Sequence, residues 1–480
     1  MQSIRKSMKP MLWPTVAVLL ATLPANVRAQ TPATPADDRA AMRQEMQELR
    51  RRLDELEQRM RIADANEARS QAAGSSATAA TLPEPNPAGA TPKSQPAVVT
   101  ADTSGFSIQS ADGDFRMKIG ADLQVDNRTF TGKGAAALTD QMLVRRLRPT
   151  VSGTVYKFVD YYFRTDFGLG TTVVNEAYMQ FNYFPHVNLR VGKFKPPVGL
   201  ERLQSDDDTA FLERGLPTLL VPSRDIGYQL AGDLLENRIS WQAGVFNGVP
   251  DNSLADASPS SHRDYAGRIF ITPFAPNRRS LLAGLGAGLG ASGGSVDGLA
   301  LPAFKTMGQN TFFTFASGVI EAGHRTRLAP QAYYYLGPFG LLAEYGLTEE
   351  GLQKGTVRRD VAFRAWQGEA TYLLTGERKN YGNLTPRRTF DPLHHGWGAV
   401  ELALRTGEFS ADHTITRYGF AVPTATPRSS REWVGGVNWY MNRIVRLSAN
   451  YAVTSFEGGT PGGNRIAERV LLFRFQLNFI

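Results

Sequence analysis

The chain of 480 residues contains no cysteine at all. Without thiols it has no disulfide framework, no cysteine zinc site and no thiol nucleophile. Beyond the first 29 residues it also lacks any apolar run approaching the ~20 residues that a membrane-spanning helix needs. Glycine (46 residues) and aromatic residues (10%) are abundant by contrast. This composition favours a chain rich in strands and turns, without redox or thiol chemistry.

The first residues have the pattern of a secretory signal. Three cations within residues 5–9 precede the apolar run Val16–Ala21, and small residues at 27 and 29 suit a cleavage site. We therefore expect a signal peptide over residues 1–29 and a mature start at Gln30. This segment holds four cations and no acid, so only +4 of the formal net charge of +8 belongs to the rest. That modest excess does not imply a nucleic-acid partner.

A single convincing helix is predicted over residues 37–65. Its apolar residues alternate spacings of four and three, which is the a/d seam of a heptad repeat: Met42, Met46, Leu49, Leu53, Leu56, Met60 and Ala63. A short oligomerising coiled coil is favoured over a solvated helix that packs on its own domain. Residues 66–113 follow as a flexible linker, because residues 71–98 are rich in Ala, Ser, Thr and Pro.

From residue 114 to 480 the apolar period changes to two. Residues 115–125 and 445–453 alternate apolar with polar side chains over about ten positions. Transmembrane strands have this length and dyad pattern, whereas soluble strands are usually five or six residues long. Tyrosine and tryptophan gather near the strand ends, as in the aromatic girdles of membrane barrels. A soluble multi-sheet sandwich, the alternative, does not explain the strand lengths.

Sixteen such segments are predicted, and an even number is typical of bacterial barrels. They lie near residues 114–130, 143–156, 159–168, 174–184, 187–195, 226–235, 238–247, 264–273, 280–290, 324–336, 339–347, 361–374, 396–408, 431–441, 444–455 and 469–480. Short connections near residues 185, 236, 337 and 442 alternate with long ones, as periplasmic turns alternate with outer loops. The long connection Thr375–His395 breaks this rule. The fold class predicted is an all-β, 16-stranded antiparallel transmembrane barrel with an N-terminal coiled-coil helix.

One loop of about thirty residues lies between the strands that contain Arg190 and Gly227. Loops of this length in a compact domain are usually functional or disordered. This one keeps apolar anchors, Phe211 and Leu219–Val221, among its charges. We expect it to fold into the lumen and narrow an anion pathway. Its acidic triplet Asp206–Asp208 either pairs with lumen arginines or indicates a broader substrate range.

The alternation along each strand also predicts which side chains face the lumen, because residues at odd and even positions point to opposite faces; this is called the parity of a residue below. If the apolar set faces lipid, arginines outnumber acids inside, and guanidinium groups match oxyanions by bidentate hydrogen bonds. An anion-selecting lumen is favoured over a wall merely hydrated by charges. Lys193 and Lys195 fall on the lipid-facing side of this alternation, so we expect them at the rim, past a bulge, or in the loop, where they would lie at the constriction. The candidates for the anion pathway are Arg146, Arg148, Arg164, Arg190, Lys193, Lys195, Arg268, Arg325, Arg327 and Arg405.

Several motifs together resemble those of the phosphate-selective porin O/P family of Gram-negative outer membranes. They are residues 192–201 (GKFKPPVGLE), 211–214 (FLER), 374–377 (LTGE), 398–405 (GAVELALR) and 438–442 (NWYMN). The resemblance implies a trimer of sixteen-stranded barrels, a third outer loop folded inward and a basic ladder for phosphate or polyphosphate. It also accounts for the long connection after Leu374. The selectivity residues are not carried over, because these motifs mark strands and loops.

Two motifs suggest enzymes only superficially. Gly290–Gly294 matches G-x-S-x-G, but that elbow needs a strand-to-helix turn, and the glycines favour a flexible loop. His394 and His395 lack a third metal ligand at suitable spacing. We expect no catalysis, metal or cofactor, and no nucleic-acid partner.

The function expected is passive, anion-preferring diffusion through a porin in the Gram-negative outer membrane. Inorganic phosphate or other small anions, outer-membrane lipid and a homotrimer are the expected partners. Two alternatives stay open. One is a general or sugar porin, and the other is a structural protein that tethers the envelope through the N-terminal helix.

Overall fold

A computed structural model describes residues 96–479, apart from residues 103–104, 135–136, 252–254, 259 and 278. The predicted signal peptide (1–29), the coiled-coil helix (37–65) and the linker up to residue 95 lie outside the described residues. They remain predictions.

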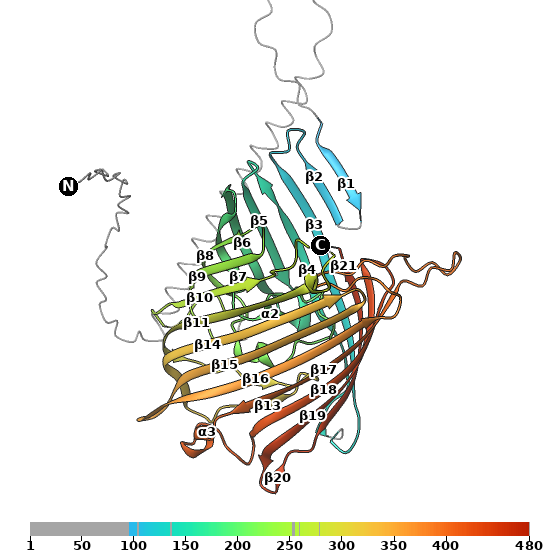
Figure 1. Ribbon diagram of the computed structural model, residues 1–480. Helices are drawn as coiled ribbons and strands as arrows, with labels where there is room; N and C mark the ends of the chain where they lie inside the picture. Colours follow the sequence, from blue (N-terminus) through green and yellow to red (C-terminus); the bar gives the residue numbers. More distant parts are fainter. Residues whose placement is uncertain are drawn as a thin grey trace, which may run out of the picture. The chain divides into compact units, whose positions relative to one another are not determined.

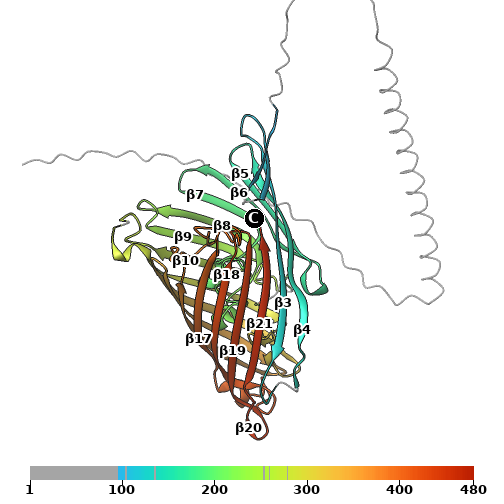
Figure 2. The ribbon, with the colours of Figure 1, turned by 90° about the vertical axis from the view of Figure 1, so that its right-hand side faces the viewer.

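Sixteen antiparallel strands close into a barrel, which confirms the predicted fold class for this part of the chain (Figure 1). The strands are β3 (Arg116–Phe130), β4 (Gln141–Val155), β5 (Val159–Asp166), β6 (Val173–Phe184), β7 (Val187–Phe194), β8 (Asp225–Leu234), β9 (Ile239–Phe246), β10 (Asp264–Ile271), β11 (Leu285–Leu299), β14 (Val319–Leu336), β15 (Phe339–Lys354), β16 (Val357–Leu373), β17 (Ala399–Ala411), β18 (Pro427–Tyr440), β19 (Val445–Thr460) and β21 (Glu468–Asn478). Each pairs with its neighbours in sequence order, and β21 pairs with β3 to close the barrel. Figure 2 shows this closure, with β21 beside β3.

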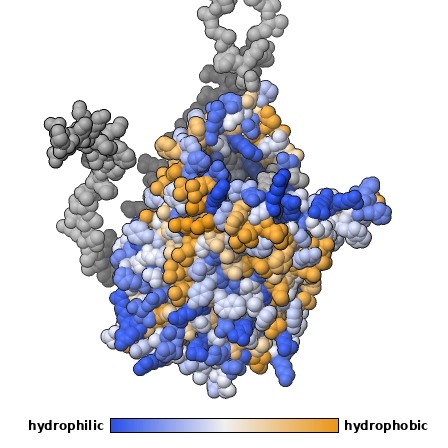
Figure 3. Space-filling model, viewed as in Figure 1, coloured by the Kyte–Doolittle hydropathy of each residue, from blue (hydrophilic) through white to orange (hydrophobic). Residues whose placement is uncertain are grey.

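Polar side chains point inward and apolar ones outward. In β17, Glu401 and Arg405 are buried whereas Leu402 and Leu404 are exposed. This is the reverse of a soluble sandwich, because the outward apolar face belongs against lipid. Figure 3 shows apolar side chains gathered over the middle of one face of the wall, with polar ones concentrated toward one end.

The two ends of the barrel differ in their connections. At one end, here called the turn end, tight hairpins join β6 to β7, β8 to β9, β14 to β15 and β18 to β19, as predicted. At the other, the loop end, most connections are long. An exception is the link between β15 and β16, which the sequence pattern suggested to be long. These two strands continue past their predicted ends and are joined by Gly355 and Thr356 alone.

Part of the predicted linker is wrong. Within residues 66–113, β1 (Val98–Asp102) and β2 (Gly105–Gln109) form a hairpin. β2 pairs with residues 116–119 of β3, just beyond the stretch of β3 that pairs with β21. Each strand has only five residues, so its alternation is too short to stand out from a Ser- and Thr-rich sequence.

Among the connections that the structure describes, three that reach into the lumen bear on the site. The first is the constriction loop, residues 195–224, which contains α2 (Leu200–Leu203) and η3 (Leu216–Leu220). The second, residues 300–318, contains β12 (Phe304–Lys305) and β13 (Thr311–Phe313) and packs its phenylalanines on Phe363 and Phe409. The third is the turn-end segment 374–398, which explains the irregular connection seen in the sequence. The predicted number of strands was therefore right, and the long connection is a folded segment rather than a sign of a missed strand.

The remaining short elements are η2 (Gly168–Gly170), η4 (Leu281–Gly284), α3 (Thr414–Arg417) and β20 (Gly463–Asn464). Within the described ranges, no helix is long and apolar enough to cross a membrane.

Candidate functional site

The constriction loop crosses the lumen and is bonded to the far wall. Both carboxylate oxygens of Glu344, on β15, accept backbone N–H groups from Leu200 (2.8 Å) and Glu201 (3.1 Å). On β19, the Asn450 side chain accepts the N–H of Leu212 at 2.9 Å. A buried loop must satisfy its backbone groups in this way or lose free energy for each one left unpaired. The prediction that the loop folds into the lumen is confirmed.

Three wall arginines serve the same anchoring role. Arg405, Arg446 and Arg474 donate to the carbonyl oxygens of Glu213 (2.9 Å), Thr209 (3.0 Å) and Leu212 (2.6 Å). Arg405 also donates to Glu432, and Arg474 forms a bidentate pair with Asp126. These three guanidinium groups are almost fully buried, and each donates to the loop backbone and to a second side chain.

Close packing on the wall explains one of the glycines. A Cβ at Gly290 of β11 would stand 2.0 Å from the carbonyl oxygen of Val198 in the constriction loop. Only glycine lets the loop approach the wall so closely. Gly290–Gly294 is therefore part of a strand, not the flexible loop that its composition suggested. It is not the nucleophile elbow of a hydrolase either, since that elbow requires a turn into a helix.

At the centre of the constriction, the buried carboxylate of Asp206 is surrounded by arginines. It pairs with Arg148 and Arg214, and it lies 3.6 Å from Arg146 and 3.8 Å from Arg224. Asp206 therefore pairs with lumen cations, and Asp207 lies 3.8 Å from Arg164, which agrees with one of the two interpretations of the acidic triplet that the sequence left open. Asp206 thus holds four guanidinium groups together, and three of these arginines contact further carboxylates: Arg148 contacts Asp166, Arg146 contacts Glu213 and Arg224 contacts Glu176.

A cavity of about 410 Å³ lies on the loop-end side of the constriction. Five cations and one carboxylate line it, together with hydroxyl and amide groups: Arg145, Arg146, Arg202, Glu213, Arg214, Thr218, Leu219, Ser223, Pro302, Ala303, Lys305, Thr306 and Gln309. The 300–318 segment supplies one side of this cavity. Its charge makes it suited to an anion with several oxygens.

A β-bulge brings an extra arginine into this cavity. Opposite Gln124 and Val125 of β3, strand β4 places Arg146 and Val144, and Arg145 between them is the unpaired extra residue. A bulge re-aims side chains, and Arg145 consequently donates to Glu213 through Nε (2.6 Å) and Nη2 (3.0 Å). Adjacent arginines thus both face the lumen, which strict alternation forbids.

A second cavity, of about 360 Å³, lies on the turn-end side. It is lined by Tyr162, Arg164, Glu176, Tyr178, Arg190, Phe194, Lys195, Leu203, Ser205, Asp207, Asp208, Asn383, Arg443 and Asn478. Four cations face three carboxylates here, so this cavity is more balanced than the first. The Arg190 guanidinium stacks over the Tyr178 ring at 4.4 Å.

Lys195 distinguishes this second cavity. Its ammonium group donates to the carbonyl oxygens of Leu203 (3.5 Å) and Gln204 (2.8 Å), with no carboxylate in ion-pair contact within the described ranges. Burial, followed by the nearby Arg214 and Arg224, holds the pKa of Lys195 well below its usual value. An anion in the cavity would favour the charged form of this lysine.

The turn-end segment 374–398 closes this side of the constriction. The hydroxyl of Tyr381 donates to the carbonyl oxygen of Leu200 (2.5 Å), and Gln204 donates to the carbonyl of Tyr381 (2.7 Å). Lys379 pairs with Glu401 of β17 at 2.6 Å. The constriction loop is therefore supported from the turn end as well as by the wall.

The structure divides the ten candidate residues into two groups. Arg146, Arg164, Arg190 and Lys195 line the cavities, and Arg148 lies between them, bonded to Asp166 and Asp206. The other five lie outside both cavity linings and contact partners elsewhere: Lys193 with Asp256, Arg268 with Gln331, Arg325 with Asp264 and Glu321, Arg327 with Asp251 and Asp264, and Arg405 with Glu432.

Six cations at the constriction were missed by the sequence reasoning. Arg202, Arg214, Arg224, Lys305 and Arg443 lie in connections, where a period of two assigns no side, and Arg145 lies at the bulge. The charges of the long loop were a signal for Arg202, Arg214 and Arg224, and they gave none for Arg145, Lys305 and Arg443, which lie outside that loop.

No cluster of three or more potential metal ligands occurs in the part of the chain that the structure describes. His394 is exposed and pairs with Asp391 at 2.6 Å. The histidine pair thus has a local partner at the surface.

A closed sixteen-stranded barrel with an inward loop and a charged constriction is the architecture of an outer-membrane porin. Residues 115–479 match the family described as phosphate-selective porin O and P, and the chain belongs to this family. It is 23% identical to Porin O of Pseudomonas aeruginosa over 401 residues, which cover 74% of this chain and 86% of that protein.

Two solved structures share the fold. The outer membrane channel DcaP of Acinetobacter baumannii superposes with a TM-score of 0.53 at 10% identity, covering 78% of this chain and all of that one. An anion-selective porin from Comamonas acidovorans gives a TM-score of 0.50 at 11% identity, covering 76% and 100%. Family and fold indicate a channel of the Gram-negative outer membrane.

Proposed function

We propose that the protein is a passive, anion-preferring porin whose preferred substrates are phosphate-type oxyanions. The observation that carries this proposal is the pair of basic cavities on the two sides of one constriction. Rings of arginine and lysine are a usual basis of anion selection in pores. No step of this function requires catalysis or a cofactor.

The path runs from the loop end, which faces the cell exterior, to the turn end, which faces the periplasm. An anion first exchanges water for the guanidinium groups of Arg146 and Arg202 in the loop-end cavity. It then passes the cluster of arginines around Asp206 and reaches Lys195. The positive charges of Arg190 and Arg443 then attract the anion toward the turn end. Several sites of moderate affinity let the anion leave again, which conduction requires.

The carboxylates tune this path rather than oppose it. Asp206 and Glu213 hold arginine side chains in fixed positions, so the guanidinium groups are preorganised for an oxyanion. They also reduce the net positive charge, which prevents the anion from being trapped. Assembly as a homotrimer is part of the proposal and rests on the family resemblance.

The test is single-channel recording in a planar bilayer, with a KCl gradient and added inorganic phosphate. We expect an anion-selective reversal potential and block of the chloride current by phosphate. Lys195→Gln should raise the half-blocking phosphate concentration about tenfold, as the loss of one charge-assisted hydrogen bond of ~1.5 kcal/mol implies.

Lys157→Gln is the matched control. Lys157 lies in the turn between β4 and β5, where it is exposed and pairs with Asp114 at 2.7 Å. The same charge is removed there without touching the pathway, so block should be unchanged. Equal phosphate block in the wild type and Lys195→Gln would contradict the role assigned to Lys195.

A general or sugar porin is the second candidate. The three carboxylates of the turn-end cavity and the stacked rings of Tyr162 and Tyr178, 5.3 Å apart, favour a mixed lumen of this kind. It would show weak selectivity and no phosphate block in the same recordings. A structural tether through the predicted N-terminal helix is a third option. Deleting residues 30–95 distinguishes a tether from a porin. A porin should keep conducting without these residues, whereas a tether should lose its effect on the envelope.

A further inference from the structure

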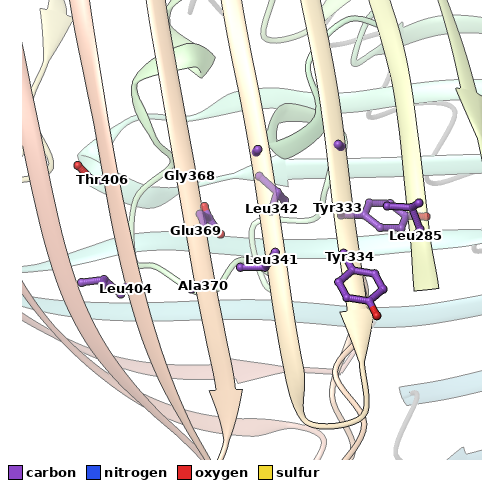
Figure 4. A pocket seen from close by; sticks show the side chains of 12 residues that line it. Leu285, Tyr333, Tyr334, Leu341, Leu342, Gly368, Glu369, Ala370, Leu404 and Thr406 are labelled. Carbon is purple, nitrogen blue, oxygen red and sulfur yellow. The ribbon is translucent and has the colours of Figure 1, made fainter. Parts of the chain in front are cut away.

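An apolar groove of about 510 Å³ crosses the outer face of the wall over β11 and β14–β17. In Figure 4, Leu404 lies on one side and Leu341 and Tyr334 lie on the other, with Gly368 and Ala370 between them. Leu341 and Leu404 are exposed, whereas the inward-facing Arg405 beside them is buried. The groove therefore opens toward the surroundings of the barrel and is separate from the anion pathway.

A charged cluster lies above this groove, toward the loop end. On β16, Arg364 lies four residues from Gly368, about 13 Å along the strand. On the neighbouring strands, Arg431 of β18 donates to Glu408 of β17 through Nε (3.1 Å) and Nη2 (2.7 Å). Arg364 has no carboxylate in ion-pair contact in the ranges that the structure describes, and its electrostatic neighbour is Asp412. The cluster thus holds two guanidinium groups, of which that of Arg431 is paired with Glu408 and that of Arg364 lies near Asp412.

Two tryptophans lie between the groove and this cluster. Trp366 on β16 and Trp433 on β18 are about half exposed on the same outward face. Such residues occupy the level of lipid headgroups at a membrane interface. Along β16 the outward order is therefore Gly368, Trp366 and Arg364, and along β18 Arg431 follows Trp433 in the same direction. Apolar surface, aromatic ring and guanidinium group succeed one another on each strand, as acyl chain, headgroup and phosphate do in an outer-leaflet lipid.

We propose that this face is a binding site for a phosphorylated glycolipid of the outer leaflet. One acyl chain occupies the groove beside Gly368, and a phosphate contacts Arg364 and Arg431. This site rests on the proposed orientation, with the loop end outward, and is independent of anion selection.

Charge favours a lipid over a second copy of the chain at this place. A phosphate can accept hydrogen bonds from both guanidinium groups at once. The other large outer groove, of about 800 Å³, is lined by side chains of β7–β11 including Tyr228, Tyr265 and Gly293. The exposed Arg263 lies two residues from Tyr265 there. That second groove provides a control surface on the same molecule.

The test is native mass spectrometry of the full chain, purified in detergent and titrated with hexa-acylated lipid A that carries two phosphates. We expect the species with one lipid bound per chain to predominate over species with more. The double variant Arg364→Gln/Arg431→Gln should weaken binding about tenfold, as should removal of both phosphates from the lipid, because charge-assisted hydrogen bonds are lost. Both arginines are exposed, so the fold should be retained.

Gly368→Leu tests the groove separately. No atom lies within 4 Å of a Cβ added at this glycine, so the leucine fills the groove without a clash. Binding of lipid A should again fall about tenfold. Two matched controls should bind as the wild type does: Gly293→Leu in the second groove, and Arg238→Gln at the turn end.

Three results would overturn the proposal. Equal binding in all variants would identify an adventitious additive only. Loss with Gly368→Leu but not with the arginine variant would assign the groove to an uncharged chain. A change of oligomeric state in Gly368→Leu with unchanged lipid binding would make this face an interface between copies. Because binding is measured without conduction, failure here leaves the porin proposal untouched.

Discussion

The two sides of the lumen wall both carry inward-facing arginines, but these arginines make different contacts. On β4–β7, Arg146, Arg164 and Arg190 line the two cavities of the constriction. On β14–β21, arginines with the same inward parity are bonded to carboxylates or loop carbonyls, as Arg327 and Arg474 show. Facing the lumen is therefore not enough to contact an anion, and the partners of each guanidinium group decide its role.

The difference arises from where the constriction loop is fastened. It leaves β7 and returns to β8, but its hydrogen bonds reach β15, β17, β18 and β19 on the opposite side. The wall that receives the loop uses its donors on the loop backbone. On the wall near the loop's origin, Arg146, Arg164 and Arg190 line the cavities while they also donate to the side chains of Gln124, Thr150 and Gln180. Three predictions test this contrast.

The largest effect is expected at the anchoring wall. Arg327→Gln would leave Asp251, 2.7 Å from a guanidinium nitrogen, without its buried partner. It would also remove one of the two arginines that pair with Asp264. Breaking a buried ion pair from one side costs about 3–5 kcal/mol. We expect a fall of that size in the free energy of unfolding, measured by denaturant titration in detergent.

Arg327→Gln/Asp251→Asn is the companion variant. Removing one carboxylate as well should recover part of the lost stability. If Arg327→Gln instead unfolds like the wild type but loses phosphate block, Arg327 belongs to the pathway and the contrast between the walls fails.

A matched pair of substitutions compares the walls directly. Arg146→Gln removes a cation that lines the loop-end cavity, and Arg446→Gln removes one that donates to Thr209 and Gln476 at the far wall. The first should raise the half-blocking phosphate concentration about fivefold, with little change in melting temperature. The second should lower the melting temperature and leave block unchanged. Identical effects of the two variants would remove the distinction.

Sequence reasoning reached the fold because each strand repeats its pattern over many residues. β3, for example, alternates inward Asp122 and Gln124 with outward Leu123, and such periodicity needs no tertiary information. It also identified the inward loop from its length and apolar anchors. Of the candidate site it recovered the lining residues on strands, since their side follows from parity.

The remainder depends on contacts between distant segments. Parity cannot separate Arg164, which lines a cavity, from Arg325, which is held by Asp264 at 2.7 Å. It cannot place Arg214 or Lys305, because a loop has no fixed side. Arg145 faces inward only because a bulge breaks the register. Each of these facts requires knowledge of which carboxylate or carbonyl lies opposite.

The smallest expected effect concerns pH and the turn-end cavity. Burial, followed by the neighbouring Asp207, raises the pKa of Asp208 to about 6. Asp208 faces Asp207, Arg446, Lys379 and Lys195, and its negative charge is present above its pKa and lost as the pH falls through about 6. The anion-to-cation permeability ratio in KCl should therefore rise about twofold between pH 8 and pH 5.

Lys195 acts in the same direction, because its lowered pKa means that it gains positive charge as the pH falls. Single variants separate the two groups. Compared with the wild type, Asp208→Asn should have a higher anion-to-cation permeability ratio at pH 8, and this ratio should rise less between pH 8 and pH 5. Lys195→Gln should have a lower permeability ratio at pH 5. The double variant should show almost no step. A full step in the double variant would place the titrating group elsewhere in the lumen and would contradict the roles assigned to Asp208 and Lys195.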